Sequence, residues 1–168
     1  MLKHFPFYKQ PDSKDCGPTC LKIIAKHYGK VLNIQTLREL SETTREGSNL
    51  LTLSEAAEQI GFRTLGVKLC ANDLVEAPLP CILHWNKNHY VVLSPLTPKG
   101  GIFNRKKDIK TFTVSDPAIG LISYTKEEFI KFWIGNNADE TTKEGIALLV
   151  EPTPKLYQET TPPDGHPS

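Results

Sequence analysis

The first regular pattern along the chain is an apolar stripe at helical spacing. Leu21, Ile24 and Tyr28 lie three to four residues apart, so they would share one face of a helix. We therefore predict a helix over residues 16–28. Gly29 would end it, because glycine readily adopts the left-handed conformation found at helix C-termini.

Two shorter helices are predicted next. Apolar residues at helical spacing follow Asn33, and a third helix is expected from Thr52 to Gly61. Thr52 and Glu55 have the spacing of a capping box, in which each side chain bonds the backbone amide of the other residue. Helices would therefore fill the first third of the chain.

The pattern becomes strand-like after Gly61. Short runs rich in apolar residues, separated by polar turns, predict strands at 62–69, 80–85, 90–93, 111–114 and 145–150. One further helix is expected where Thr125 and Glu128 form a capping box, with an aromatic face directed at the core. Helices followed by an antiparallel sheet give an α+β fold.

Two segments lack a regular pattern. Residues 94–110 contain prolines and glycines followed by a basic cluster, which predicts an extended loop or hairpin. Residues 152–168 hold five prolines and no apolar periodicity, which is typical of a linker or tail. We therefore predict one folded domain over residues 1–151 and a Pro-rich tail over residues 152–168.

Composition narrows the function classes. The 168 residues suit one domain, and 20 Lys and Arg balance 19 Asp and Glu, so no global charge favours a nucleic-acid or anionic-membrane partner. The N-terminus lacks the apolar core of a signal peptide, and no apolar run approaches the roughly 20 residues of a membrane-spanning helix. The four cysteines are therefore expected to be reduced thiols in the cytoplasm.

The candidate chemistry centres on Cys16, where a polar loop turns into the first helix with Asp15 as a predicted N-cap. The thiolate is the nucleophilic form of cysteine, and the positive end of a helix favours it. His89 could act as a base and Asp116 could orient its imidazole. The side-chain amide of Gln10 could stabilise an oxyanion together with a backbone N–H. These residue types are the parts of a cysteine hydrolase.

The residues alone leave other interpretations open. A cysteine is commonly a small buried hydrophobe, and Cys20, Cys70 and Cys81 are expected to be packing residues. No Cys-x-x-Cys pair supports a zinc site. His84 competes with His89 as the base, and Asp116, which precedes a proline, could be an ordinary turn residue.

Three separated motifs resemble one known family. Gln10 with the segment 15–21 (Asp-Cys-Gly-Pro-Thr-Cys-Leu), the run 89–93 (His-Tyr-Val-Val-Leu) and the run 116–120 (Asp-Pro-Ala-Ile-Gly) are similar, in this order, to the bacteriocin-processing cysteine peptidases that act on double-glycine leaders. The resemblance covers roughly residues 3–151. It implies a papain-like fold, usually found as the N-terminal domain of a peptidase-containing ABC transporter.

The resemblance also implies residue roles. By motif position, Cys16 is the nucleophile, His89 the base, Asp116 the orienting carboxylate and Gln10 the oxyanion donor. The family's histidine heads the His-Tyr-Val-Val run, which favours His89 over His84. The implied reaction is cleavage after the Gly-Gly pair that ends a leader peptide, coupled to export of the released peptide.

Partners and cofactors follow from the same resemblance. The implied partners are a precursor peptide with a double-glycine leader and the transmembrane and nucleotide-binding domains of an ABC transporter. Nucleic acid is not expected. The peptidase step needs no cofactor, and ATP and magnesium are implied only for a full-length transporter at the cytoplasmic face of the inner membrane. We interpret residues of about 95–108 as an insertion relative to the family.

Two alternative functions remain at this point. The chain could be a non-catalytic domain that only docks leader peptides, or another papain-like acyl-transfer enzyme. Relatives of the first kind lose the nucleophile, whereas this chain keeps Cys16, His89 and Asp116. The second kind would use the same three side chains, so only substrate specificity distinguishes it from a leader peptidase.

Overall fold

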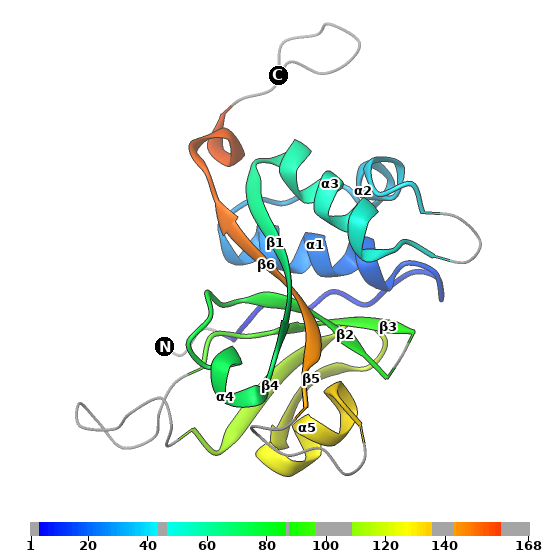
Figure 1. Ribbon diagram of the computed structural model, residues 1–168. Helices are drawn as coiled ribbons and strands as arrows, with labels where there is room; N and C mark the ends of the chain where they lie inside the picture. The colour runs from blue at the N-terminus through cyan, green and yellow to red at the C-terminus, as the bar shows by residue number, and fades with distance from the viewer. Residues whose placement is uncertain (1–3, 44–46, 87, 97–108, 136–142, 159–168) are drawn as a thin grey trace, which may run out of the picture.

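A computed structural model describes residues 4–43, 47–86, 88–96, 109–135 and 143–158 of the chain. Three helices come first along the chain, and strands dominate afterwards (Figure 1). The elements are α1 (Cys16–His27), α2 (Ile34–Leu40), α3 (Leu50–Ile60), β1 (Phe62–Leu69), α4 (Ala71–Leu74), β2 (Cys81–Trp85), β3 (His89–Leu93), β4 (Thr111–Asp116), β5 (Gly120–Thr125), α5 (Lys126–Trp133), β6 (Gly145–Pro152) and the 3₁₀ helix η2 (Pro154–Tyr157).

The strands of the described chain form one six-stranded sheet in the order β1-β6-β2-β3-β4-β5. Each neighbouring pair is antiparallel. The last strand in sequence, β6, lies between β1 and β2, so a late segment of the chain pairs with two earlier strands. The α+β class with an antiparallel sheet, predicted from the order of patterns, is confirmed.

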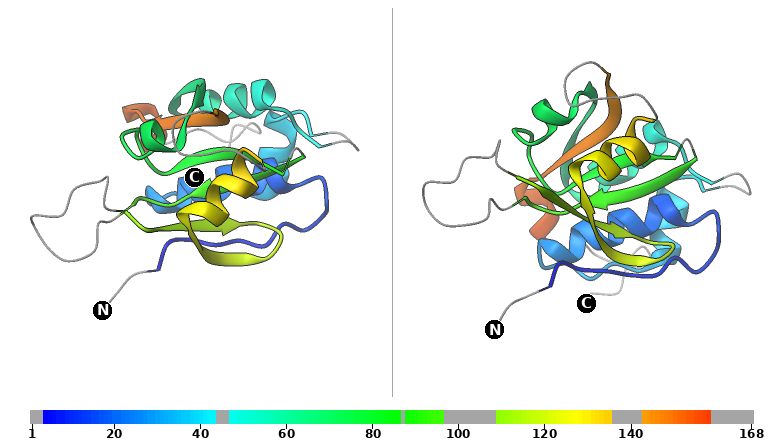
Figure 2. Two further views of the ribbon diagram at one scale, coloured as in Figure 1. Left: turned by 60° about the horizontal axis from the view of Figure 1, so that its bottom comes forward. Right: turned by 90° about the horizontal axis from the view of Figure 1, so that it is seen from below.

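The two faces of the sheet carry separate cores. Along β3, Tyr90 and Val92 contact the core around α1 and α3, whereas Val91 and Leu93 belong to the core that includes α5. This alternation follows from the strand period of two, which directs successive side chains to opposite faces. Figure 2 shows α1 and α5 on opposite sides of the central strands. Of the predicted α1 stripe, Leu21 and Ile24 are fully buried, and Tyr28 is partly buried against the same core.

The start of α3 differs from the prediction. The capping box is formed by Asn49 and Thr52, and the helix begins at Leu50. Asn49 has the extended backbone of an N-cap, and its side chain accepts from the amide of Thr52 at 2.9 Å. The predicted pairing of Thr52 with Glu55 is wrong, because an earlier cap uses Thr52 as its third residue. The predicted box of Thr125 and Glu128 is confirmed at α5.

The segment after β6 begins as part of the folded domain. Leu156 in η2 is buried beside Gly61, which has a φ of +127° and where a Cβ would collide with the Leu156 backbone. Thr153 also donates through its backbone amide to the Gly61 carbonyl at 2.9 Å. The tail predicted from residue 152 therefore starts with packed residues, while residues 159–168 lie outside the described chain.

Several other features complete the description. The short helix α4 and the strand β5 were not predicted. In β5, half-buried and exposed positions alternate, and the strand has no apolar run. Most of the predicted insertion and its basic cluster, at residues 97–108, lies outside the described residues. Within the described ranges, no helix is both long and apolar enough to cross a bilayer.

Candidate active site

Cys16 is the first residue of α1 and is almost fully buried. The turn before the helix is closed by the amide of Asp15, which donates to the carbonyl of Asp12 at 3.0 Å. Helix α1 packs against β3, the strand that begins with His89. The fold therefore brings the candidate nucleophile to the strand that carries the candidate base.

The Asp15 side chain does not cap α1, although its position is that of the N-cap. Its carboxylate is fully buried and faces Arg38 of α2, which donates through Nε at 2.8 Å and through a terminal nitrogen at 2.5 Å. The predicted capping role of Asp15 is thus wrong at the level of the side chain. A buried carboxylate requires a paired cation, and that requirement outweighs the cap.

His89 and Asp116 form a close pair at the ends of neighbouring strands. His89 Nε2 lies 2.6 Å from Oδ1 of Asp116, and the same oxygen accepts from the backbone amide of Ala118 at 2.9 Å. Asp116 is 4% exposed, so it holds the imidazole in a largely dry position. The pair explains why Asp116, followed by proline, is more than a turn residue: its carboxylate bonds both the turn and the ring.

Cys16 lies close enough to the His89 ring to affect the pKa of the imidazole. Because Nε2 faces Asp116, the nitrogen that remains for the sulfur is Nδ1. Burial lowers the pKa of His89, but the hydrogen bonds to Asp116 and Cys16 and their negative charges prevail and raise that pKa to about 9. The imidazole is then protonated at neutral pH.

Gln10 lies next to this group through its backbone. Its amide donates to the carbonyl of Pro117 at 2.8 Å, so the N-terminal segment runs beside the residue that follows Asp116. The side-chain nitrogen of Gln10 donates to the Asp12 carbonyl at 3.0 Å. A primary amide carries two N–H groups, and the bond to Asp12 uses one of them. Among the described residues, the second N–H has no recorded acceptor, and the side-chain oxygen Oε1 is buried without a partner.

The competing residues have other surroundings. The His84 ring contacts the Tyr90 ring at a centroid distance of 5.3 Å, on the strand beside β3. Cys20 is fully buried; its burial, followed by the charges of Cys16 and Asp116, raises the pKa of its thiol well above the usual value. Cys81 is also fully buried, and burial raises its pKa. These two thiols are packing residues, as predicted.

Sequence reasoning missed Arg38. It is one of 20 Lys and Arg residues, and its helix, α2, has an ordinary mixed surface. No local motif links it to Cys16, because the connection is made by Asp15 across 23 residues. The Arg38 guanidinium lies beside the start of α1 because α2 packs against α1.

One family model and several curated relatives match the chain. The model of the peptidase C39 family matches residues 4–144. Over 158 residues the chain is 30% identical to the probable microcin-H47 secretion/processing ATP-binding protein MchF of Escherichia coli, covering 94% of this chain and 20% of that protein. It is 36% identical over 132 residues to the lactococcin-G-processing and transport ATP-binding protein LagD of Lactococcus lactis, covering 75% and 17%. The chain thus spans about a fifth of the length of such curated relatives.

Solved structures give the same result. A double-glycine-motif protease from an AMS/PCAT transporter, in complex with its leader peptide, superposes with a TM-score of 0.72 at 28% identity, covering 88% of this chain and 91% of that chain. The peptidase domain of Streptococcus ComA gives a TM-score of 0.69 at 30% identity, covering 89% and 100%. The predicted papain-like fold class, with a helical half on an antiparallel sheet, is confirmed.

Proposed function

The chain belongs to the peptidase C39 family, and we propose that it is a cysteine endopeptidase that cleaves leader peptides after a Gly-Gly pair. The observation that carries this proposal is the position of His89, which lies 2.6 Å from the Asp116 carboxylate and close enough to Cys16 for that residue to affect its pKa. That arrangement is what a nucleophilic thiol, its acid–base partner and an orienting group require.

In the proposed mechanism the Cys16 thiolate attacks the carbonyl carbon of the second glycine. The electron pair of the carbonyl moves to its oxygen, which becomes an oxyanion. The backbone N–H of Cys16 has no intrahelical acceptor because it belongs to the first turn of α1, so it can donate to that oxyanion. The free N–H of the Gln10 side chain supplies the second donor.

The following steps use the proton held by His89. The imidazolium, protonated at neutral pH, gives its proton to the departing amine, so the peptide bond breaks and a thioester remains on Cys16. Neutral His89 then takes a proton from water, which attacks the thioester and releases the leader. Asp116 keeps the ring in one orientation throughout, through its bond to Nε2.

The requirement for Gly-Gly has a simple physical basis. A narrow passage beside the nucleophile would exclude any Cβ next to the scissile bond, and glycine is the residue without one. The relatives are secretion or transport proteins that also bind ATP, as their names state. We therefore propose that this chain acts at the cytoplasmic face of a membrane, with transmembrane and nucleotide-binding domains as partners. ATP and magnesium would serve those domains only.

One experiment tests the proposal directly. The protein is mixed with a synthetic precursor peptide whose leader ends in Gly-Gly, and the products are identified by mass. We expect one cut after the second glycine, no cut in a precursor with Ala-Ala, and no cut by Cys16→Ala. Efficient processing of the Ala-Ala precursor would favour a broader acyl-transfer enzyme, and leader binding without cleavage by the wild type would favour a docking domain.

A further inference from the structure

The residue before the nucleophile is held by an arginine from another helix. Asp15 is completely buried, and both of its carboxylate oxygens accept from the guanidinium of Arg38. This two-point contact fixes orientation as well as distance, since a guanidinium presents parallel N–H groups to a carboxylate. The backbone of Asp15 is bonded too: its amide donates to Asp12 and its carbonyl accepts from Thr19 at 3.0 Å.

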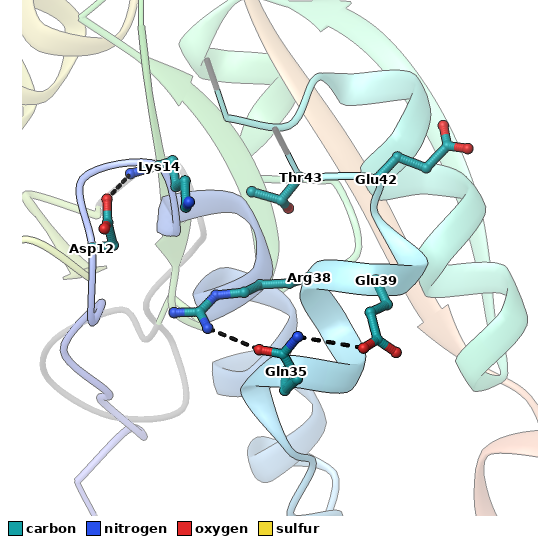
Figure 3. A pocket seen from close by; sticks show the side chains of 7 residues that line it. All are labelled: Asp12, Lys14, Gln35, Arg38, Glu39, Glu42 and Thr43. Atoms are coloured by element: carbon teal, nitrogen blue, oxygen red, sulfur yellow. Dashed lines mark hydrogen bonds between the residues drawn. The ribbon is translucent and has the colours of Figure 1, made fainter. Parts of the chain in front are cut away.

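Arg38 is itself held by a chain of side chains on α2. Gln35 accepts from Arg38 at 3.1 Å through its Oε1, and its Nε2 donates to Glu39 at 3.3 Å. Figure 3 shows these residues on one wall of a cavity of about 440 Å³, with Asp12 and Lys14 on the opposite wall. The guanidinium therefore lies between solvent and the loop that leads into the nucleophile.

The peptide bond between Asp15 and Cys16 carries the N–H that the proposed mechanism assigns to the oxyanion. With the Asp15 carboxylate, amide and carbonyl all bonded, the plane of that peptide has little freedom to turn. An ion pair between a buried carboxylate and a partly exposed arginine contributes little net stability, because desolvation of the carboxylate offsets the attraction. Its placement directly before Cys16 is better explained by the direction that it gives to this N–H.

We infer that Arg38 is a positioning residue for the reaction, which acts through Asp15 to aim the Cys16 backbone N–H at the oxyanion. The inference rests on the proposed peptidase function. It concerns one donor of the oxyanion site and leaves the formation of the thiolate to His89. Loss of this alignment should lower kcat and spare both precursor affinity and the reactivity of the sulfur.

Arg38→Lys is the variant that tests the inference. It keeps the positive charge beside the buried carboxylate but replaces two parallel bonds by a single point contact. We expect kcat for a Gly-Gly precursor to fall about 10–100-fold with KM changed less than about twofold, since small misplacements of a reacting group cost about this much. Alkylation of Cys16 by iodoacetamide, which needs a thiolate and no oxyanion site, should keep its wild-type rate.

A matched control is available on the far side of the sheet. Arg63 of β1 pairs with Glu151 of β6 at 3.3 Å on the surface, and Arg63→Lys should leave kcat unchanged. A Gln10→Ala background adds a second criterion. Because both changes would weaken one oxyanion site, the double variant should lose less than the product of the single losses.

A p-nitrophenyl ester of acetylglycine separates this inference from the proposed function, because its hydrolysis needs the oxyanion site but no leader recognition. If the wild type hydrolyses the ester but no precursor, the leader-peptidase proposal fails while Arg38→Lys is still judged on the ester. Wild-type kcat in Arg38→Lys on both substrates would overturn the inference. So would an alkylation rate that falls as far as kcat, because the pair would then serve the thiolate.

Discussion

His89 Nε2 lies 2.6 Å from Asp116 Oδ1, although 27 residues separate them in sequence. Adjacent antiparallel strands make this contact possible, since β3 begins at His89 and β4 ends at Asp116. The carboxylate and the sulfur of Cys16 together raise the pKa of the imidazole to about 9 against the opposing effect of burial. A proton is therefore bound more tightly in the folded protein than in the unfolded chain.

This difference predicts that the free energy of unfolding depends on pH. Between the usual histidine pKa of 6.5 and the folded value of about 9, the folded state holds a proton that the unfolded chain releases. The stabilisation from His89 is fully present below pH 6.5 and is lost as pH rises through about 9. Urea unfolding of Cys16→Ala, which has no thiol at that site to release a proton in exchange, should show this trend across the range, and adding Asp116→Asn should flatten the slope. An equal slope after adding Asp116→Asn would contradict the assignment.

The two thiols of α1 should respond differently to substitution. Cys16→Ala is expected to abolish cleavage and keep the fold, because its sulfur is the proposed nucleophile. Cys20→Ser should keep kcat within a few-fold, while the free energy of unfolding falls by about 1–3 kcal/mol, since a hydroxyl at a fully buried site must find a partner. Peptide turnover and urea unfolding measure the two effects. A loss of activity in Cys20→Ser as large as that in Cys16→Ala would reverse the roles.

The two histidines of the β2–β3 hairpin give a second matched pair. His89→Ala should lower kcat by at least about 100-fold, because acid–base catalysis by a positioned side chain contributes about this much. His84→Ala removes a ring that contacts Tyr90 and should leave kcat within a few-fold. Precursor cleavage at fixed pH compares them. Equal activity of the two variants would overturn the choice of base.

Much of the fold could be predicted because its signals are local. The α1 stripe, the β2 and β3 runs and the α5 capping box each lie within one short segment, and their burial or hydrogen bonds in the structure match the prediction. Cys16, His89, Asp116 and Gln10 were chosen from motifs; the structure pairs His89 with Asp116 and places the Gln10 backbone against Pro117. Their roles in the reaction remain proposals.

The missed features depend on contacts between distant segments. The buried carboxylate of Asp15 needs a cation, and Arg38 supplies it from a helix whose sequence shows no such task. Likewise, β5 is a strand because β4 pairs with it along its full length, in a register that joins Thr111 to Thr125. Neither feature can be recognised from the sequence of a single segment.

Two substitutions distinguish the Asn49–Thr52 cap of α3 from a cap formed by Thr52 and Glu55. Asn49→Ala removes the acceptor for the Thr52 amide, and we expect it to lower the free energy of unfolding by about 1 kcal/mol. Glu55→Ala, which would break the cap first predicted from the sequence, changes an exposed side chain and should have little effect. Urea unfolding of the two variants compares these positions. A larger loss in Glu55→Ala would favour the cap first predicted.

Gly17→Ala should destabilise the protein, although alanine is the better helix former by about 1 kcal/mol. A Cβ at position 17 would lie 2.8 Å from Cδ2 of Leu53 and would also collide with the hydroxyl of Ser48. Crowding of this kind typically costs about 1–3 kcal/mol, which exceeds the gain in helix propensity. Because Gly17 follows Cys16, the displaced helix start should also lower kcat.

The control for this effect is Gly66→Ala in β1, where a Cβ would meet Leu50 at an ordinary 3.6 Å. It should change the free energy of unfolding by less than about 0.5 kcal/mol, as surface substitutions usually do. Adding Ser48→Ala to Gly17→Ala removes one of the colliding atoms and should restore part of the stability. If Gly17→Ala is as stable as the wild type, residues 47–49 can move aside for the added methyl group. The close packing around Gly17 would then not be needed to hold the start of α1 in place.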